Sequence, residues 1–84
     1  GLRDIAGRAR IQARIERLAS GNPGDHRNLS GGVSELRIDV GPGYRVYYTV
    51  RGDELIILLV GGDKSSKAVQ QRDIALAQEL ARSL

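Results

Sequence analysis

Apolar positions along the chain follow a helical period first, then a strand period, then a helical period again. Over residues 2–20, Ile11, Ile15 and Leu18 fall within about 60° of one another on a helical wheel. The run at 21–24 ends this predicted helix, because its glycines supply a left-handed cap and Pro23 cannot continue the ladder. A polar loop is expected over 21–32.

Residues 33–40 and 44–50 alternate between apolar and polar side chains, which predicts two strands joined by a Gly-Pro-Gly turn at 41–43. A second turn at 51–54 leads to the unbroken apolar run 55–60, which is typical of a strand buried inside a sheet. A helix is predicted over 67–83, with Ser65 or Ser66 as its cap. Its predicted core stripe is Ile74, Ala77, Ala81 and Leu84, flanked by Leu76 and Leu80.

These elements predict a single α+β domain over 1–84, with an antiparallel three-stranded meander packed against an N-terminal and a C-terminal helix. Both helices are expected on the sheet face that carries Leu36, Ile38, Val46 and Tyr48. The opposite face is then partly open, and strand alternation places Arg37, Arg45 and Tyr47 on it.

The amino-acid composition excludes some kinds of site. The 84 residues include no cysteine and one histidine, so disulfides are excluded and a structural zinc site is not expected; a reducing cytoplasm is consistent with this. No run has the length of a membrane helix. The net charge of +3 points only weakly to a polyanionic partner. Most of the positive charge is arginine, which pairs bidentately with phosphate.

The exposed strand face is a candidate phosphate site. Arg37 and Arg45 can both donate to phosphate oxygens, Tyr47 can stack on a base, and Lys64 follows the last strand at the same end. Without metal ligands or a cofactor, RNA cleavage would use the substrate's own 2′-hydroxyl, with cations stabilising the pentacovalent phosphate. Simple anion binding and a plain surface with weak strand ion pairs remain open alternatives.

The first predicted helix carries a row of arginines beside its apolar stripe. Its members are Arg3, Arg10, Arg14 and Arg17. Such a row is either an ordinary solvated helix face or a surface that follows an RNA backbone without reading sequence. His26 is expected to be a polar loop residue, although its imidazole has the chemistry of a general base.

Several segments together resemble the HigB-like addiction-module killer proteins of the RelE/ParE toxin superfamily. They are 32–39, 41–48, 58–66 and 73–75. The resemblance implies a bacterial type II toxin encoded beside a helix-turn-helix, HigA-like antitoxin. It implies metal-independent mRNA cleavage, often on the ribosome, in the cytoplasm, whereas the related ParE branch inhibits DNA gyrase. By position, the resemblance implies that Arg45 matches the superfamily arginine that contacts the scissile phosphate. Lys64 matches a basic residue that stabilises the transition state. Arg37 is a third basic contact, with a looser match.

The chain departs from that pattern at three points. The family's usual first strand is expected to be missing, Glu35 stands near a position that is basic in the RelE branch, and the last helix has no tyrosine. A non-catalytic remnant that only binds antitoxin or RNA is therefore a further alternative. If the missing strand would pair with 55–60, that strand has an open apolar edge, which predicts homodimerisation or strand exchange.

Overall fold

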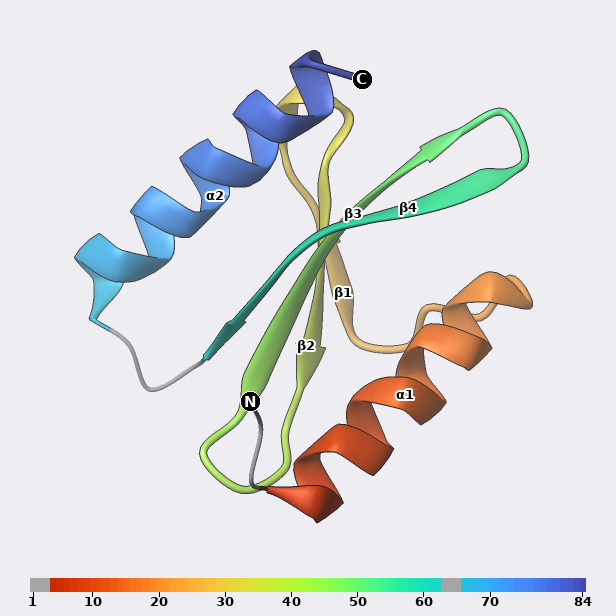
Figure 1. Ribbon diagram of the computed structural model, residues 1–84, viewed down its shortest axis with the longest axis vertical. Coiled ribbons are helices and arrows are strands. Elements are labelled where there is room, and N and C mark those ends of the chain that lie inside the picture. The colour runs from red at the N-terminus through yellow and green to blue at the C-terminus, as the bar shows by residue number, and fades with distance from the viewer. Residues whose placement is uncertain (1–3, 63–65) are drawn as a thin grey trace.

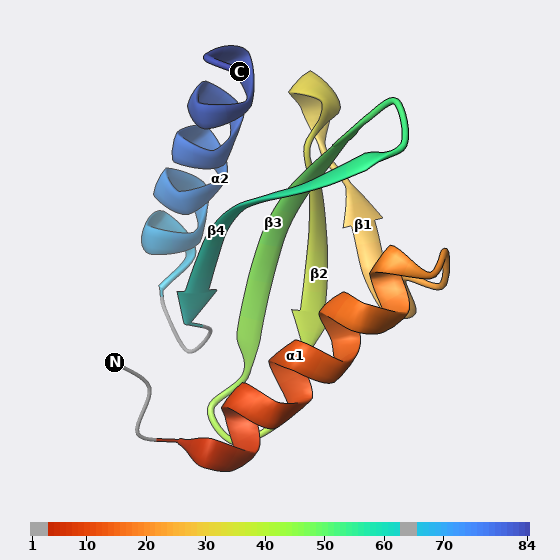
Figure 2. The same cartoon turned by 45° about the vertical axis from the view of Figure 1, so that its right-hand side comes forward.

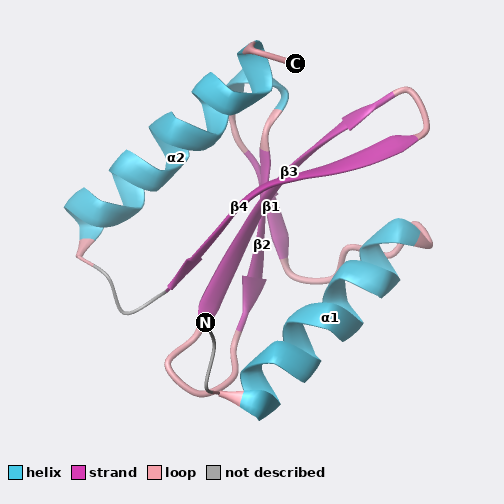
Figure 3. Cartoon of the chain, in the orientation of Figure 1, coloured by secondary structure: helices cyan, strands magenta, loops and turns pink. Residues whose placement is uncertain are grey.

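The computed structural model describes residues 4–62 and 66–84 of the chain. Its elements are α1 (Ile5–Ala19), β1 (His26–Asn28), the short 3-10 helix η1 (Ser30–Gly32), β2 (Ser34–Ile38), β3 (Tyr44–Arg51), β4 (Glu54–Gly62) and α2 (Lys67–Arg82). Figure 1 shows the twisted sheet crossing between the two helices, and Figure 3 separates helices from strands by colour. Among the described residues, no helix has the length and apolar content needed to cross a membrane.

The sheet has four antiparallel strands in the order β1-β2-β3-β4, so the α+β class is confirmed but the three-stranded meander is wrong. The additional strand is β1, which lies in the segment predicted to be a loop. It pairs with β2 through His26↔Leu36 and Asn28↔Ser34. All three of its residues are polar and exposed, so no alternation of apolar side chains marks it in the sequence.

The two helices cover opposite faces of the sheet, which corrects the prediction that both lie on one face (Figure 2). The α1 side buries Ile11, Leu36, Ile38, Tyr44, Val46 and Tyr48. The α2 side buries Val33, Tyr47, Ala77 and Ala81. A strand between two helices needs apolar side chains on both faces, and β3 meets this need because Tyr47 packs on the face that also carries Arg45.

The predicted burial of β4 and of part of α2 is wrong. β4 is an edge strand, and Ile57 and Val60 are 38% and 46% exposed. On α2 the small residues Ala77 and Ala81 form the contact with the sheet, whereas the leucines are left outside it. The exposed leucines are Leu76, Leu80 and Leu84. The predicted cap is confirmed at Ser66, whose hydroxyl accepts from the Val69 amide at 3.2 Å.

The start of α1 is fastened to the turn between β2 and β3. The Asp4 carboxylate caps the helix by accepting from the Gly7 amide at 2.9 Å, and it also accepts from the Tyr44 hydroxyl at 2.8 Å. These two hydrogen bonds, in that order, lower the pKa of Asp4 below its usual value. A Cβ at Gly41, where φ is +56°, would stand 3.2 Å from the same carboxylate. Asp4 thus holds the helix and the turn together.

Candidate functional site

A groove of about 520 Å³ lies beside the turn between β2 and β3. Its lining includes Arg37, Arg45, Asp25, Asp39 and the turn at 41–43. Arg37 and Arg45 are direct cross-strand partners, so the prediction that they share one face is confirmed. Like charges directly opposite each other on neighbouring strands are unfavourable. Nearby carboxylates relieve this repulsion. Arg37 pairs with Asp25, and Arg45 pairs with Glu35.

Arg37 is held only loosely by its carboxylate. Its guanidinium lies 3.0 Å from Asp25 Oδ1, and the two side chains are 50% and 55% exposed. Exposed pairs of this kind contribute about 0–1 kcal/mol. A phosphate that enters the groove can therefore take the place of Asp25 at little cost.

Arg45 is held by a carboxylate that has no contact with solvent. The Glu35 side chain is 0% exposed, and its Oε2 lies 3.6 Å from Arg45 Nε. Its Oε1 lies 3.3 Å from the guanidinium of Arg27, which reaches it from β1. Glu35 Oε1 and Arg45 Nε are both buried and form no hydrogen bond. Since Arg45 also lines the groove, one guanidinium joins the buried anion to the open site.

Tyr47 lies under α2 and is 1% exposed, so the prediction of an exposed ring available for base stacking is wrong in this conformation. It stands directly opposite Glu35 in the β2–β3 register. Burial, and then the charge of Glu35, raises the pKa of Tyr47 to about 12. Asp73 of α2 packs against Gly61, where a Cβ would stand 2.8 Å from Asp73 Oδ2. The absence of a side chain at Gly61 therefore lets α2 approach the sheet beside Tyr47.

Arg14 is part of the framework of the groove. Its guanidinium donates to the carbonyl oxygens of Arg37 at 2.9 Å, Pro23 at 3.0 Å and Asp25 at 3.2 Å. It thus joins α1 to the end of β2 and to the loop before β1. This engagement separates it from the row of free arginines that the helical wheel predicted.

We expect Arg14→Ala to lower the free energy of unfolding by about 1–2 kcal/mol, because three carbonyls, of which the one at Pro23 is half-buried, lose a charged donor. Arg10→Ala is the matched control, because Arg10 is exposed on the same helix and its loss should change stability by less than about 0.5 kcal/mol. Urea unfolding followed by circular dichroism measures both. Equal stabilities of the two variants would contradict a framework role for Arg14.

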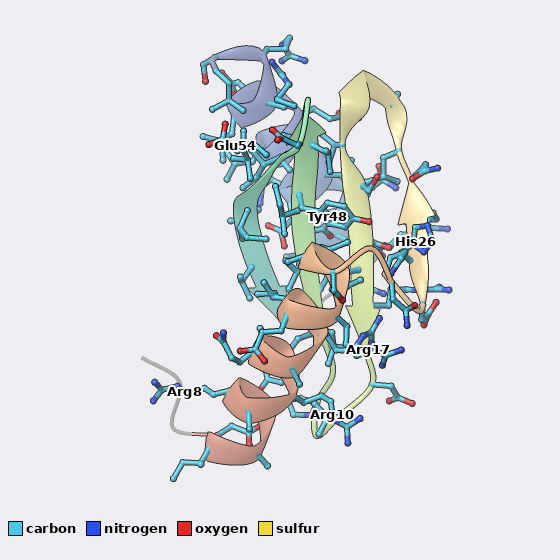
Figure 4. All side chains as sticks on the ribbon, turned by 90° about the vertical axis from the view of Figure 1, so that its right-hand side faces the viewer. Arg8, Arg10, Arg17, His26, Tyr48 and Glu54 are labelled. Carbon is cyan, nitrogen blue, oxygen red and sulfur yellow. The ribbon has the colours of Figure 1, made fainter. Side chains whose placement is uncertain are left out.

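The other described arginines of the predicted row, Arg10 and Arg17, are exposed on α1. Figure 4 shows Arg10 and Arg17 on the side of α1 that is nearer to His26, whereas Arg8 points the other way. The His26 ring contacts the Gly24 carbonyl oxygen through Nδ1 at 2.8 Å and does not line the groove. Lys64 and Arg3 lie outside the described residues.

Comparison with known proteins identifies the family of this chain. Residues 4–82 match the family model "Phage derived protein Gp49-like (DUF891)". The chain belongs to this Gp49-like family. An uncharacterized protein of Haemophilus influenzae is 48% identical over 83 residues, a match that covers 99% of this chain and 81% of the relative. No solved structure matches.

Membership assigns the chain to a group related to toxin–antitoxin systems. The Gp49-like family is associated with RelE/HigB-like toxins, so an antitoxin partner is implied in general. In this family member, no cluster of three histidine, cysteine, aspartate or glutamate residues within 4–62 and 66–84 is arranged to hold a metal ion.

Sequence reasoning missed the residues that position Arg45. Alternation over 33–40 puts Glu35 on the same face as Arg37, but it does not say what covers that face, and Glu35 is fully buried there. Arg27 was missed because β1 was not recognised as a strand. One signal was available: Glu35 stands between Val33 and Arg37 and opposite Tyr47, so two large apolar neighbours share its face.

Proposed function

We propose that this Gp49-like protein is the toxin of a toxin–antitoxin pair and that it cleaves mRNA in the groove beside the β2–β3 turn. The observation that carries the proposal is the cross-strand pair Arg37↔Arg45, both members of which line the groove. Two guanidinium groups on adjacent strands can both donate to one phosphate, and Arg45 forms an ion pair at 3.6 Å with the buried Glu35 carboxylate.

The reaction uses the 2′-hydroxyl of the RNA. The 2′-oxygen attacks the adjacent phosphorus, the bond from phosphorus to the 5′-oxygen breaks, and the products are a 2′,3′-cyclic phosphate and a 5′-hydroxyl. Arg45 and Arg37 offset the charge that develops on the phosphate oxygens. The groove carboxylates of Asp25 and Asp39 are available to accept the 2′ proton, and Lys64 is proposed to donate to the leaving 5′-oxygen.

The partners follow from the same proposal. RNA enters along the exposed arginines Arg10 and Arg17, which contact its backbone and supply affinity without sequence choice. The natural substrate is proposed to be mRNA on the ribosome. The neutralising partner is proposed to be a HigA-like helix-turn-helix antitoxin.

Induced expression in bacteria tests the function. We expect growth arrest, together with cellular mRNA that carries new 5′-hydroxyl ends, and we expect co-expression of the antitoxin to restore growth. Primer extension locates the cleavage sites in the mRNA. Incubation of the purified protein with ribosomes and mRNA tests whether the protein alone is sufficient for this cleavage.

Two results would contradict the proposal and support the alternatives. Growth arrest with intact mRNA and inhibited supercoiling by DNA gyrase would support a ParE-like inhibitor. A stable antitoxin complex without growth arrest or RNA cleavage would support a non-catalytic binding protein.

A further inference from the structure

Arg27 of β1 lies on the same sheet face as the two arginines of the groove. It pairs in register with Glu35, and Arg37 stands two residues further along β2, so all three side chains point to the α2 side. Arg45 is the cross-strand partner of Arg37 and continues this set onto β3. Three arginines therefore stand on three adjacent strands of one face.

The arginines at the β1 end of this face are open to solvent. Helix α2 packs on η1, β3 and β4, and Figure 2 shows β1 at the opposite edge of the sheet from β4. The side chains of Arg27 and Arg37 are 47% and 50% exposed, compared with 22% for Arg45. The exposed arginine surface thus extends from the groove toward β1, away from the β4 edge.

The buried ion cluster beneath this surface has one anion for two cations. Glu35 forms an ion pair with both Arg27 and Arg45, and neither arginine has another carboxylate partner among the described residues. One negative charge therefore faces two positive charges. Because Glu35 itself has no contact with solvent, the surplus positive charge lies where the guanidinium groups reach the surface. An anion bound at that surface would complete the pairing.

Arg27 also has unused hydrogen-bond donors. Its Nη2 donates to Glu35 Oε2 at 3.4 Å and lies 3.3 Å from Oε1. Within 4–62 and 66–84 its guanidinium makes no other hydrogen bond, although the planar fork carries several more N–H groups. Arg27 and Arg37 are diagonal neighbours on adjacent strands, about 7–8 Å apart, a separation that two long side chains can span. One phosphate can therefore accept from both.

We propose that Arg27 and Arg37 form a second phosphate subsite, which binds the RNA phosphate adjacent to the one between Arg37 and Arg45. The inference rests on the proposed function and adds to it the course of the RNA strand, across the sheet from β3 toward β1. Arg37 is shared by the two subsites, since its ion pair with Asp25 is exposed and weak. Contacts to phosphate position the backbone without reading bases, so the subsite supplies affinity rather than sequence preference.

Binding of uncleavable oligonucleotides tests the subsite separately from catalysis. The probes are RNAs in which every 2′-hydroxyl is methylated: an octanucleotide, and a dinucleotide with a single phosphate. We expect Arg27→Gln to weaken octanucleotide binding about three- to tenfold and to reduce the slope of log K against log salt by about 0.7. Dinucleotide binding should be unchanged. Arg8→Gln is the control of equal charge, because Arg8 points away from the side of α1 nearer to His26 (Figure 4), and it should change neither affinity.

A purely structural role for Arg27 would give a different result. If Arg27 acted only by holding Glu35, and through it Arg45, Arg27→Gln would weaken binding of both oligonucleotides equally, and this outcome would overturn the proposal. Octanucleotide binding that is insensitive to Arg27→Gln, or that the unmodified chain lacks, would overturn it as well. Circular dichroism confirms that each variant is folded.

Arg37→Gln gives a second test that does not disturb the buried carboxylate, because the ion pair of Arg37 is with the exposed Asp25. Arg37 would contact two phosphates of the octanucleotide and one of the dinucleotide, so its loss should weaken octanucleotide binding more. An equal loss for both would contradict a second subsite. RNA that keeps its 2′-hydroxyls tests cleavage separately: intact RNA beside a length-dependent Arg27 effect would refute cleavage alone, and cleavage beside length-independent effects would refute the subsite alone.

Discussion

Arg45→Ala is expected to lower the rate of RNA cleavage by about 10²–10³-fold and to abolish growth arrest. Arg45 lines the groove and is 22% exposed, and its Nε lies 3.6 Å from Oε2 of the buried Glu35 carboxylate. A preorganised cation contributes more to a transition state than a mobile one, because its orientation costs nothing at the moment of reaction. The rate of cleavage of a defined RNA measures the loss of activity. Growth curves after induction measure the loss of toxicity.

Arg45→Ala also leaves Glu35 with one fewer partner, so lost activity must be separated from lost folding. Arg45→Lys keeps a positive charge near Glu35 but lacks the planar fork that reaches carboxylate and phosphate together. We expect it to retain most of the stability and little of the activity. Thermal unfolding compares the stability of Arg45→Lys and Arg45→Ala with that of the unmodified chain.

Arg8→Ala is the control for net charge, because Arg8 points away from the side of α1 that carries Arg10 and Arg17 (Figure 4). Its activity should equal that of the unmodified chain. A folded Arg45→Ala variant that still cleaves RNA and arrests growth would exclude the nuclease mechanism proposed for this groove.

The sequence predicts those parts of the fold that depend on neighbouring residues. The β2–β3 hairpin follows from local alternation and from glycines at 41 and 43, whose φ values are +56° and +86°. The Ser66 cap depends on one hydroxyl and an amide three residues later. The pairing of Arg37 with Arg45 follows from the register of a short hairpin.

The parts that depend on distant contacts could not be predicted in this way. Which helix covers which face is decided by both faces of β3 together. Tyr47 is buried under α2, although strand alternation places it on the same face as Arg45. Arg14 belongs to a regular row on the helical wheel, but three carbonyls from other segments engage it. Each of these outcomes requires knowledge of the tertiary packing.

Glu35→Ala should lower the free energy of unfolding by about 3–5 kcal/mol. Its side chain is fully buried between Arg27 and Arg45. Its removal leaves the half-buried guanidinium of Arg45 without its anion and also leaves a cavity. Urea unfolding measures the loss, and Glu54→Ala, at an exposed position, should change stability by less than about 0.5 kcal/mol.

A combined variant shows whether Glu35 acts through charge or through packing. Arg27→Met, Glu35→Leu and Arg45→Met together replace the whole buried ion cluster by apolar side chains of similar volume, which is often neutral or stabilising. We expect it to regain most of the stability that Glu35→Ala loses and to remain without RNA cleavage. If Glu35→Ala unfolds at the same urea concentration as the unmodified chain, the carboxylate does not hold Arg45. In that case Arg45 would be a mobile side chain of the groove. RNA cleavage should then survive Glu35→Ala, because the activity would not depend on orientation of the guanidinium by Glu35.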